Sequence, residues 1–158
     1  MTTEIATQDE VSEVASLLIP LHEKQLVLPN VTVAEIIPYR QPKPIGDSTP
    51  WLLGQMEWRN TFIPVLSYEL LNGGGMPPID ADARFAVING CGTSRNLPFY
   101  AVLIQGIPRL LHVSEQDVVE VEAMRSAEYD QCAVSLFGEQ AMIPDLDRIE
   151  HELLRFIG

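Results

Sequence analysis

The residues of this chain most able to bind a metal ion or to act as nucleophiles are few. They are three histidines and two cysteines: His22, His112, His151, Cys91 and Cys132. A structural zinc site or a reactive dithiol needs such residues at short, regular spacings, and these five show none. Asp147 and His151 stand four residues apart, but this spacing is more typical of a solvated helix face. We therefore expect no metal ion and no cofactor.

A cluster of acids offers a second kind of chemistry. Four carboxylates that could act as acid and base, or hold a metal, stand close together: Glu115, Asp117, Glu120 and Glu122. A turn capped by Ser114, followed by a charged strand edge, explains them better. The chain also lacks the phosphate-binding glycine loops and the HExxH and GxSxG motifs of common enzymes. We expect a protein that is not an enzyme, with a small acidic β-barrel enzyme as the alternative.

Two further charges stand within apolar sequence. Glu35 lies between Val31–Ala34 and Ile36-Ile37, and Arg59 follows the largely apolar segment 51–58. A charge among apolar residues needs a partner or a place at an edge, because isolated burial is costly. The sequence therefore predicts that Glu35 and Arg59 pair with each other.

Composition narrows the class of partner. The 158 residues include 22 acids and 10 bases, which give a net charge of −12, and 46% are hydrophobic. Such a chain can form a packed core but repels nucleic acid and anionic membrane surfaces. An oligonucleotide-binding barrel is the weaker alternative, because Trp51, Trp58, Phe99 and Tyr100 have few basic neighbours.

The ends and the apolar runs bear on location. The longest nearly apolar run, 14–21, is too short to span a bilayer, which takes roughly 20 residues. The first ten residues carry acids where a signal peptide would carry Lys or Arg. We expect a cytoplasmic protein that does not insert into a membrane, with a flexible acidic N-terminus over residues 1–13.

Short β-like runs must position these residues. The pattern predicts hairpins over 14–21 with 25–28, 52–59 with 62–66 around Asn60-Thr61, and 133–137 with 141–146 around 138–140. It predicts further strands over 84–89 and 99–113, the latter bent near Gly106 and Pro108. Helical segments are expected over 31–37 after an Asn30 cap, over 68–71, and from about residue 147 to the end.

Two segments half a chain apart repeat one pattern. Phe62–Ser67 and Met142–Asp147 both read as strand, proline and turn, and each is followed by a helix with a Leu-Leu pair. We interpret this as two similar β lobes, each closed by a short helix.

The segment Pro50–Leu66 resembles the central motif of the CheW-like chemotaxis coupling proteins, in which a glycine precedes an Arg-Gly turn and an Ile-Pro strand. Val33–Ile36, Ala101–Ile107 and Ile143–Ile149 resemble other segments of that family in the same order. The resemblance covers about residues 14–157. Asn60, Ser67 and Gln105 replace a glycine and two aspartates, which suggests a divergent branch, from a system that controls twitching motility.

The resemblance implies a mainly β fold with two five-stranded β-barrel lobes, short helices and a C-terminal helix, intertwined in a single domain over 14–157. It implies an adaptor that couples the cytoplasmic tip of a chemoreceptor to the regulatory domain of a CheA-type histidine kinase. The receptor would bind a groove between the lobes, in a helix-in-groove mode. On this chain the matching groove positions are Val33, Ile36, Ile37, Ile104 and Ile107.

The same resemblance assigns roles to four more residues. Glu35 and Arg59 match the family's acid and arginine, and are expected to orient the groove wall. Gly54 and Asn60 match its two turn positions. Asn can replace glycine there because it tolerates a positive φ.

Overall fold

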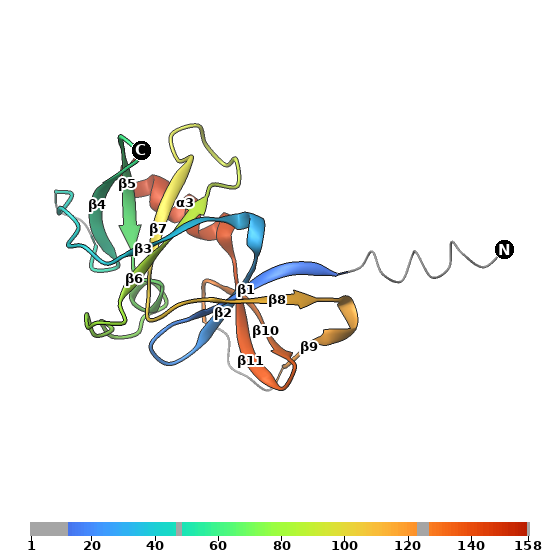
Figure 1. The fold of residues 1–158 in the computed structure, drawn as a ribbon. Coiled ribbons are helices and arrows are strands. Elements are labelled where there is room, and N and C mark those ends of the chain that lie inside the picture. Colours follow the sequence, from blue (N-terminus) through green and yellow to red (C-terminus); the bar gives the residue numbers. More distant parts are fainter. Residues whose placement is uncertain (1–12, 47–48, 123–126, 158) are drawn as a thin grey trace.

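The protein is mainly β, as expected. The computed structural model describes residues 13–46, 49–122 and 127–157, and within them eleven strands form two sheets (Figure 1). Lobe one is a six-stranded sheet with the order β8-β1-β2-β11-β10-β9, and lobe two is a five-stranded sheet with the order β3-β6-β7-β5-β4. The expectation for residues 1–13 lies outside the described residues, except at the exposed Glu13.

The strands of lobe one are β1 (Val14–Pro20), β2 (Gln25–Pro29), β8 (Arg109–Val113), β9 (Val118–Glu120), β10 (Asp130–Leu136) and β11 (Glu139–Pro144). Those of lobe two are β3 (Val33–Pro38), β4 (Leu52–Trp58), β5 (Thr61–Leu66), β6 (Arg84–Asn89) and β7 (Phe99–Ile104). The helices are η1 (Asn30–Thr32), α2 (Tyr68–Leu71), η2 (Glu115–Asp117) and α3 (Leu146–Ile157).

The two lobes share one topology, which bears out the repeat. In lobe one, β11 is antiparallel to β10 and parallel to β2. In lobe two, β5 is antiparallel to β4 and parallel to β7. The two similar segments, 62–67 and 142–147, therefore end equivalent strands, each of which leads into a helix. The extra strand of lobe one is the short β9 at its edge.

All three predicted hairpins are confirmed, but the turn predicted at 60–61 lies at 59–60, and the loop predicted over 138–140 is a two-residue turn at 137–138. Arg59 and Asn60 carry positive φ angles of 48° and 63°, and Phe137 and Gly138 carry 50° and 84°. Positive φ at both central residues defines the two-residue turn whose twist matches that of the strands it joins. Thr61 consequently pairs with Trp58 as part of β5.

Two predicted elements were wrong. In the predicted segment 31–37 only Val31 and Thr32 are helical, as part of η1; Asn30 provides no cap, and the chain continues as β3, antiparallel to β6. The β-branched residues of this segment favour a strand once a partner strand is available. The predicted strand 99–113 is two strands in different lobes, since β7 pairs with β6 and β8 with β1. Gly106, packed against Pro20, marks the crossing.

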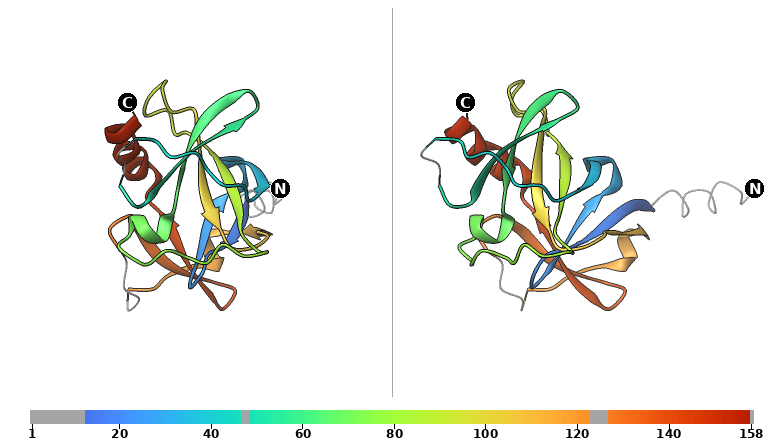
Figure 2. Two further views of the ribbon diagram at one scale, coloured as in Figure 1. Left: turned by 90° about the vertical axis from the view of Figure 1, so that its left-hand side faces the viewer. Right: turned by 60° about the vertical axis from the view of Figure 1, so that its left-hand side comes forward.

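The two α-helices each contact the lobe opposite to the strand that leads into them. In α2, which follows β5, Tyr68 donates its hydroxyl proton to the carbonyl of Tyr129 at 3.0 Å, next to lobe one's β10. In α3, which follows β11, Glu150 accepts from Tyr100 of lobe two at 3.2 Å. Figure 2 shows α3 beside the strands of lobe two, and α2 beside lobe one, which is the lower lobe in these views. The helices thus tie the lobes together rather than closing their own lobe.

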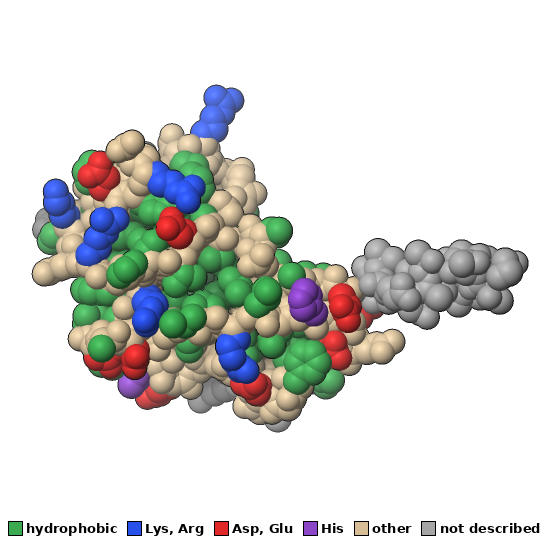
Figure 3. Space-filling model, in the orientation of Figure 1, with side chains coloured by type: hydrophobic (Ala, Val, Ile, Leu, Met, Phe, Trp, Pro, Cys, Tyr) green, Lys and Arg blue, Asp and Glu red, His purple; other side chains and the backbone are tan. Residues whose placement is uncertain are grey.

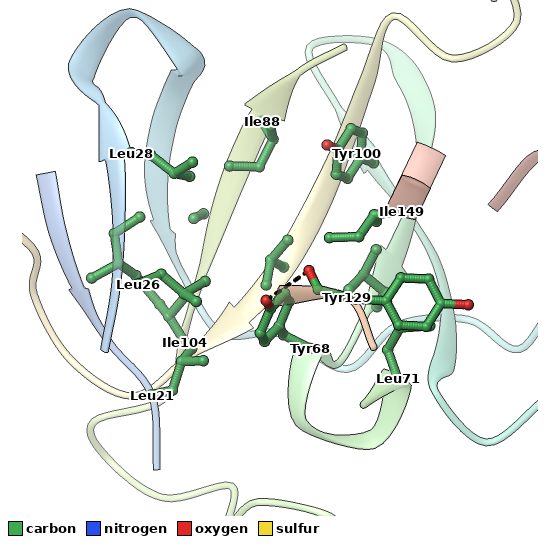
Figure 4. Packing of buried hydrophobic residues seen from close by; sticks show 14 of the residues in the cluster. Leu21, Leu26, Leu28, Tyr68, Leu71, Ile88, Tyr100, Ile104, Tyr129 and Ile149 are labelled. Carbon is green, nitrogen blue, oxygen red and sulfur yellow. Dashed lines mark hydrogen bonds between the residues drawn. The ribbon is translucent and has the colours of Figure 1, made fainter. Parts of the chain in front are cut away.

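One apolar core joins the two lobes. Leu26 and Leu28 of β2 pack in one cluster with Ile88 of β6 and Ile104 of β7 (Figure 4). Because these side chains are buried from both sides, separating the lobes would expose them to water, at roughly 25 cal/mol per Å² of apolar surface. Two smaller clusters fill the lobes themselves.

Candidate partner-binding groove

The three groove residues predicted on strand β3 do not all face the space between the lobes. Val33 and Ile36 pack against the core between the lobes, whereas Ile37 packs against the core of lobe two. The register explains this, because Val33 and Ile36 pair with Ile88 and Ala86 of the shared core. Only Val33 and Ile36 are therefore placed to line a surface between the lobes.

Strands β1 and β8 add two residues to the same surface. Leu17 is half-buried and packs against the shared core, and Leu110 lies directly opposite it and is 55% exposed. Sequence reasoning missed both, because it read 99–113 as one strand and so did not place β8 beside β1. The signal that could have found the break is the Gly106 and Pro108 pair.

The remaining predicted groove residues differ sharply in exposure. Ile104 is fully buried in the shared core, so it can support a groove only from beneath. Ile107 is 70% exposed; it follows Gln105, whose amide donates to Pro20 at the end of β1. Val31, in η1 near the other end of β1, is also exposed.

Leu17, Val33 and Ile36 thus border the core between the lobes, and the exposed Leu110 lies opposite Leu17. Figure 3 shows hydrophobic side chains across the middle of the face on which β3, β1 and β8 lie. We use the name interlobe groove for the surface around six residues, three beside the shared core and three exposed near β1 or β8: Leu17, Val33, Ile36, Val31, Ile107 and Leu110. Exposed apolar residues gathered in this way mark an interaction site more often than isolated ones do.

The predicted ion pair lies on the lobe-two side of β3. The guanidinium of Arg59 is 3.4 Å from Oε1 of Glu35. The same oxygen accepts a shorter hydrogen bond, 2.9 Å, from the indole nitrogen of Trp58. Arg59 also stacks 4.6 Å from the centroid of the Trp58 ring. Sequence reasoning missed Trp58, although it precedes Arg59 directly in the motif.

This trio borders a hollow of about 450 Å³. Its other lining residues include Ile37, Tyr39 and Arg40. Arg40 donates to the backbone carbonyl of Glu57, which holds the segment after β3 against β4. The Arg59 side chain remains 67% exposed, so its cation can meet a partner while Glu35 and Trp58 fix its position. The arrangement suits recognition of a polar or acidic group beside an apolar surface.

Of the two predicted turn residues, Asn60 lies in the turn of the hairpin that carries Arg59, whereas Gly54 lies within β4, next to a shift in its register with β5. Gly54 has a φ of +142°, and a Cβ atom there would lie 2.2 Å from the carbonyl oxygen of Lys43. Lys43 pairs with Gln55 in an isolated bridge, so this close approach anchors the loop before β4. Asn60 adopts the left-handed φ described above and leaves the turn intact.

Neither a metal-ion cluster nor a membrane-spanning helix is found within the described residues. No group of three or more His, Cys, Asp or Glu side chains there could hold a metal ion. No helix of that part of the chain is long and apolar enough to cross a membrane. The acids Glu115 and Asp117 belong to η2, where the Asp117 carboxylate accepts from the Ser114 amide in a capping box.

Comparison with known proteins agrees with this fold. The sequence model of the CheW-like domain family matches residues 15–153. The crystal structure of the scaffolding protein TtCheW from Thermoanaerobacter tengcongensis is similar, with a TM-score of 0.71 and 13% sequence identity, over 84% of this chain and 88% of that one. No curated protein sequence matches the chain. Because the family match spans most of its length, the chain belongs to the CheW-like domain family.

Proposed function

We propose that this protein is a non-enzymatic adaptor that couples the cytoplasmic tip of a chemoreceptor to the regulatory domain of a CheA-type histidine kinase. Membership of the CheW-like family supports a chemosensory scaffold in general. The observation that carries the finer proposal is the interlobe groove, an apolar surface, together with an oriented cation on the lobe-two side of β3. A helical hairpin with apolar residues at helical spacing would fit such a surface. The protein would act in the cytoplasm, where both partners present these parts.

The groove supplies the affinity in this proposal. Val33 and Leu110 come from different lobes, so a helix laid between them would contact both. A charge placed at either position would be desolvated on binding and would cost several kcal/mol. Leu110 is more than half exposed, so its replacement by Asp should leave the fold intact.

The test is binding of the purified chain to a purified receptor tip, measured by calorimetry. V33D and L110D should each weaken binding at least tenfold, while V119D, at an exposed position of β9, should not. Unchanged thermal unfolding would show that the variants stay folded. Normal receptor binding by both folded variants would contradict the groove assignment.

Glu35 and Arg59 supply orientation. Both side chains are partly exposed, so the pair itself should contribute only about 0–1 kcal/mol to stability. Its role would be to aim the guanidinium, and E35A should therefore weaken partner binding through Arg59. In a double-mutant cycle, E35A with R59A should be less harmful than the sum of the single changes. Strict additivity would mean that the two residues act independently.

Experiments in cells and cell lysates are needed to identify the partners and the pathway. A pull-down from lysate with this chain as bait should recover a chemoreceptor and a CheA-type kinase, and R59A should recover less receptor. We propose control of twitching motility as the pathway, on the basis of the substitutions at Asn60, Ser67 and Gln105. Loss of the gene should then abolish directed twitching and spare swimming; the reverse result would assign a flagellar pathway.

A further inference from the structure

Lobe one contains a cavity of about 320 Å³ that the adaptor function does not use. Every strand of lobe one contributes to its wall. The apolar lining comprises Val14, Val27, Leu28, Pro29, Val113, Val118, Val134, Leu136 and Ile143. The remaining lining residues are Ser16, Ser114 and Glu115.

The two lobes differ in how their sequences fill equivalent sheets. The core of lobe two contains Phe85, Trp58 and Met56 among nine buried residues. The buried core of lobe one consists of Leu18, Val113, Val134, Leu136 and Ala141, without one aromatic ring. Apart from β9 the two sheets share one topology, and the lobe with the smaller buried side chains is the one that contains the cavity.

The wall of the cavity determines which ligand it could accept. The Ser16 hydroxyl donates to the carbonyl of Val14 at 3.3 Å, and the Ser114 hydroxyl donates to Asp117 at 3.0 Å. Both hydroxyl protons are thus already used, and the lining offers a ligand little beyond apolar contact. Glu115 is exposed at the rim, close in sequence to Asp117, so an anion would be repelled.

We propose that the lobe-one cavity is a binding site for a neutral apolar small molecule. Val14 and Val118, which are 50% and 38% exposed, flank an open mouth through which such a molecule can enter. The volume lies within the range of small-molecule pockets and exceeds that of cavities that hold a benzene ring, roughly 150 Å³. A molecule of one or two fused rings, or an aliphatic chain of similar bulk, matches the space.

The test uses the full chain and the neutral fluorescent probe N-phenyl-1-naphthylamine. The wild type should bind one equivalent with saturable enhancement of fluorescence. V118F and V27F, which place a ring in the cavity, should each weaken binding at least tenfold. V119F is the matched control: Val119 is the next residue of β9, is exposed and does not line the cavity, so its affinity should stay within twofold.

Several results would overturn the proposal. They are absence of saturable binding by the wild type, normal binding by both folded filling variants, and a stoichiometry other than one. An anionic naphthalene sulfonate that binds the wild type as tightly as the neutral probe would refute the neutral class, whereas gain of its binding in E115K would support it. A wild-type dimer that V118F converts to a monomer in sedimentation would identify the cavity as a contact between copies and exclude a ligand site.

Discussion

At Gly54 the backbone passes too close to Lys43 for any side chain to fit. We expect G54A to destabilise the protein by at least about 2 kcal/mol, because a Cβ would meet the Lys43 carbonyl and the φ of +142° is strained for alanine. Denaturant unfolding measures the loss. G75A is the control, since a Cβ at Gly75 meets nothing within 4 Å and should change stability little. Equal stability of the two variants would contradict this account.

The thiol of Cys91 should be unusually slow to react. Desolvation, the hydrogen bond to Glu150 and the charge of that carboxylate raise its pKa to about 11, above the usual value of about 8.5. In a C132S background, alkylation by iodoacetamide should therefore accelerate with pH through about 11. E150Q should lower that midpoint, because it removes the charge and keeps an acceptor for the Cys91 amide.

Asp147 provides the control for the thiol. Its charge is the weakest of the influences on Cys91, so D147N should shift the midpoint less than E150Q does. Equal shifts in the two variants would mean that Glu150 has no special role. An alkylation midpoint near 8.5 in the parent protein would contradict the raised pKa.

At the scale of single residues, the sequence predicted which charged residues pair, but it did not predict which apolar residues are exposed. Glu35 and Arg59 stood out in the sequence because a charge among apolar residues needs a partner, and the two lie 3.4 Å apart. The closer partner of Glu35 is Trp58, which was not predicted because the indole is neutral and the reasoning considered only charged partners. Similarly, Ile104 and Ile107 look alike in sequence, yet one is buried and the other exposed.

At the scale of elements, hydrogen bonds between side chains link three strands of lobe one, β2, β8 and β11. Arg109 of β8 donates twice to the Glu139 carboxylate of β11, at 2.7 and 2.9 Å, and Gln25 of β2 donates to the same group at 3.3 Å. The hydrogen bonds from Arg109 and then Gln25 lower the pKa of Glu139 in the folded protein. A carboxyl whose folded pKa is lowered stabilises the fold above its unfolded pKa, about 4.3, and loses that effect as pH falls through the folded value.

The pH dependence of E139Q follows from this sign. The variant should melt at a lower temperature than the wild type at neutral pH, and the difference should shrink as pH falls below about 4. Melting curves across the acid range measure it. E23Q, at an exposed glutamate of the β1–β2 turn, should show no such convergence. A difference that grows toward acid pH would have the wrong sign for this mechanism.

Local sequence rules identified hairpins well and long-range pairing poorly. The turns at 59–60 and 137–138 were nearly right because turn chemistry is local. Strand β3 was mistaken for a helical turn because its partner β6 lies about fifty residues away, and only that pairing favours the extended form. For the same reason the groove residues Leu17 and Leu110 could not be brought together before β8 was placed beside β1.

At the scale of the whole molecule, the crossed helices should make the two lobes unfold together. We propose that residues 14–157 form one domain, in which α2 contacts lobe one and α3 contacts lobe two. Both tryptophans lie in or beside lobe two, while far-UV circular dichroism reports on all the strands. The two signals should give coincident denaturant transitions. Separate midpoints would mean that the lobes unfold independently.

Tyr68 is the most direct link to test. Its buried hydroxyl donates to the Tyr129 carbonyl and also contacts the Asp130 carboxylate of β10. Y68F keeps the ring and leaves these acceptors without that donor, so it should cost about 1–3 kcal/mol of stability without separating the transitions. Y39F is a suitable control, since Tyr39 is only half-buried. If Y68F loses no more stability than Y39F, the Tyr68 hydroxyl does not help to hold the lobes together.

The nesting of the lobes sets an order for their completion on the ribosome. Lobe two occupies one continuous stretch, 33–104, whereas lobe one combines 14–29 with 109–144. The β1–β2 hairpin is therefore synthesised first but gains its remaining partner strands last. Until then the face that packs inside lobe one, which carries Leu18 and Val27, stays uncovered during translation. A nascent chain stalled just after residue 104 would present a finished inner lobe with this hairpin as the segment most open to chaperones.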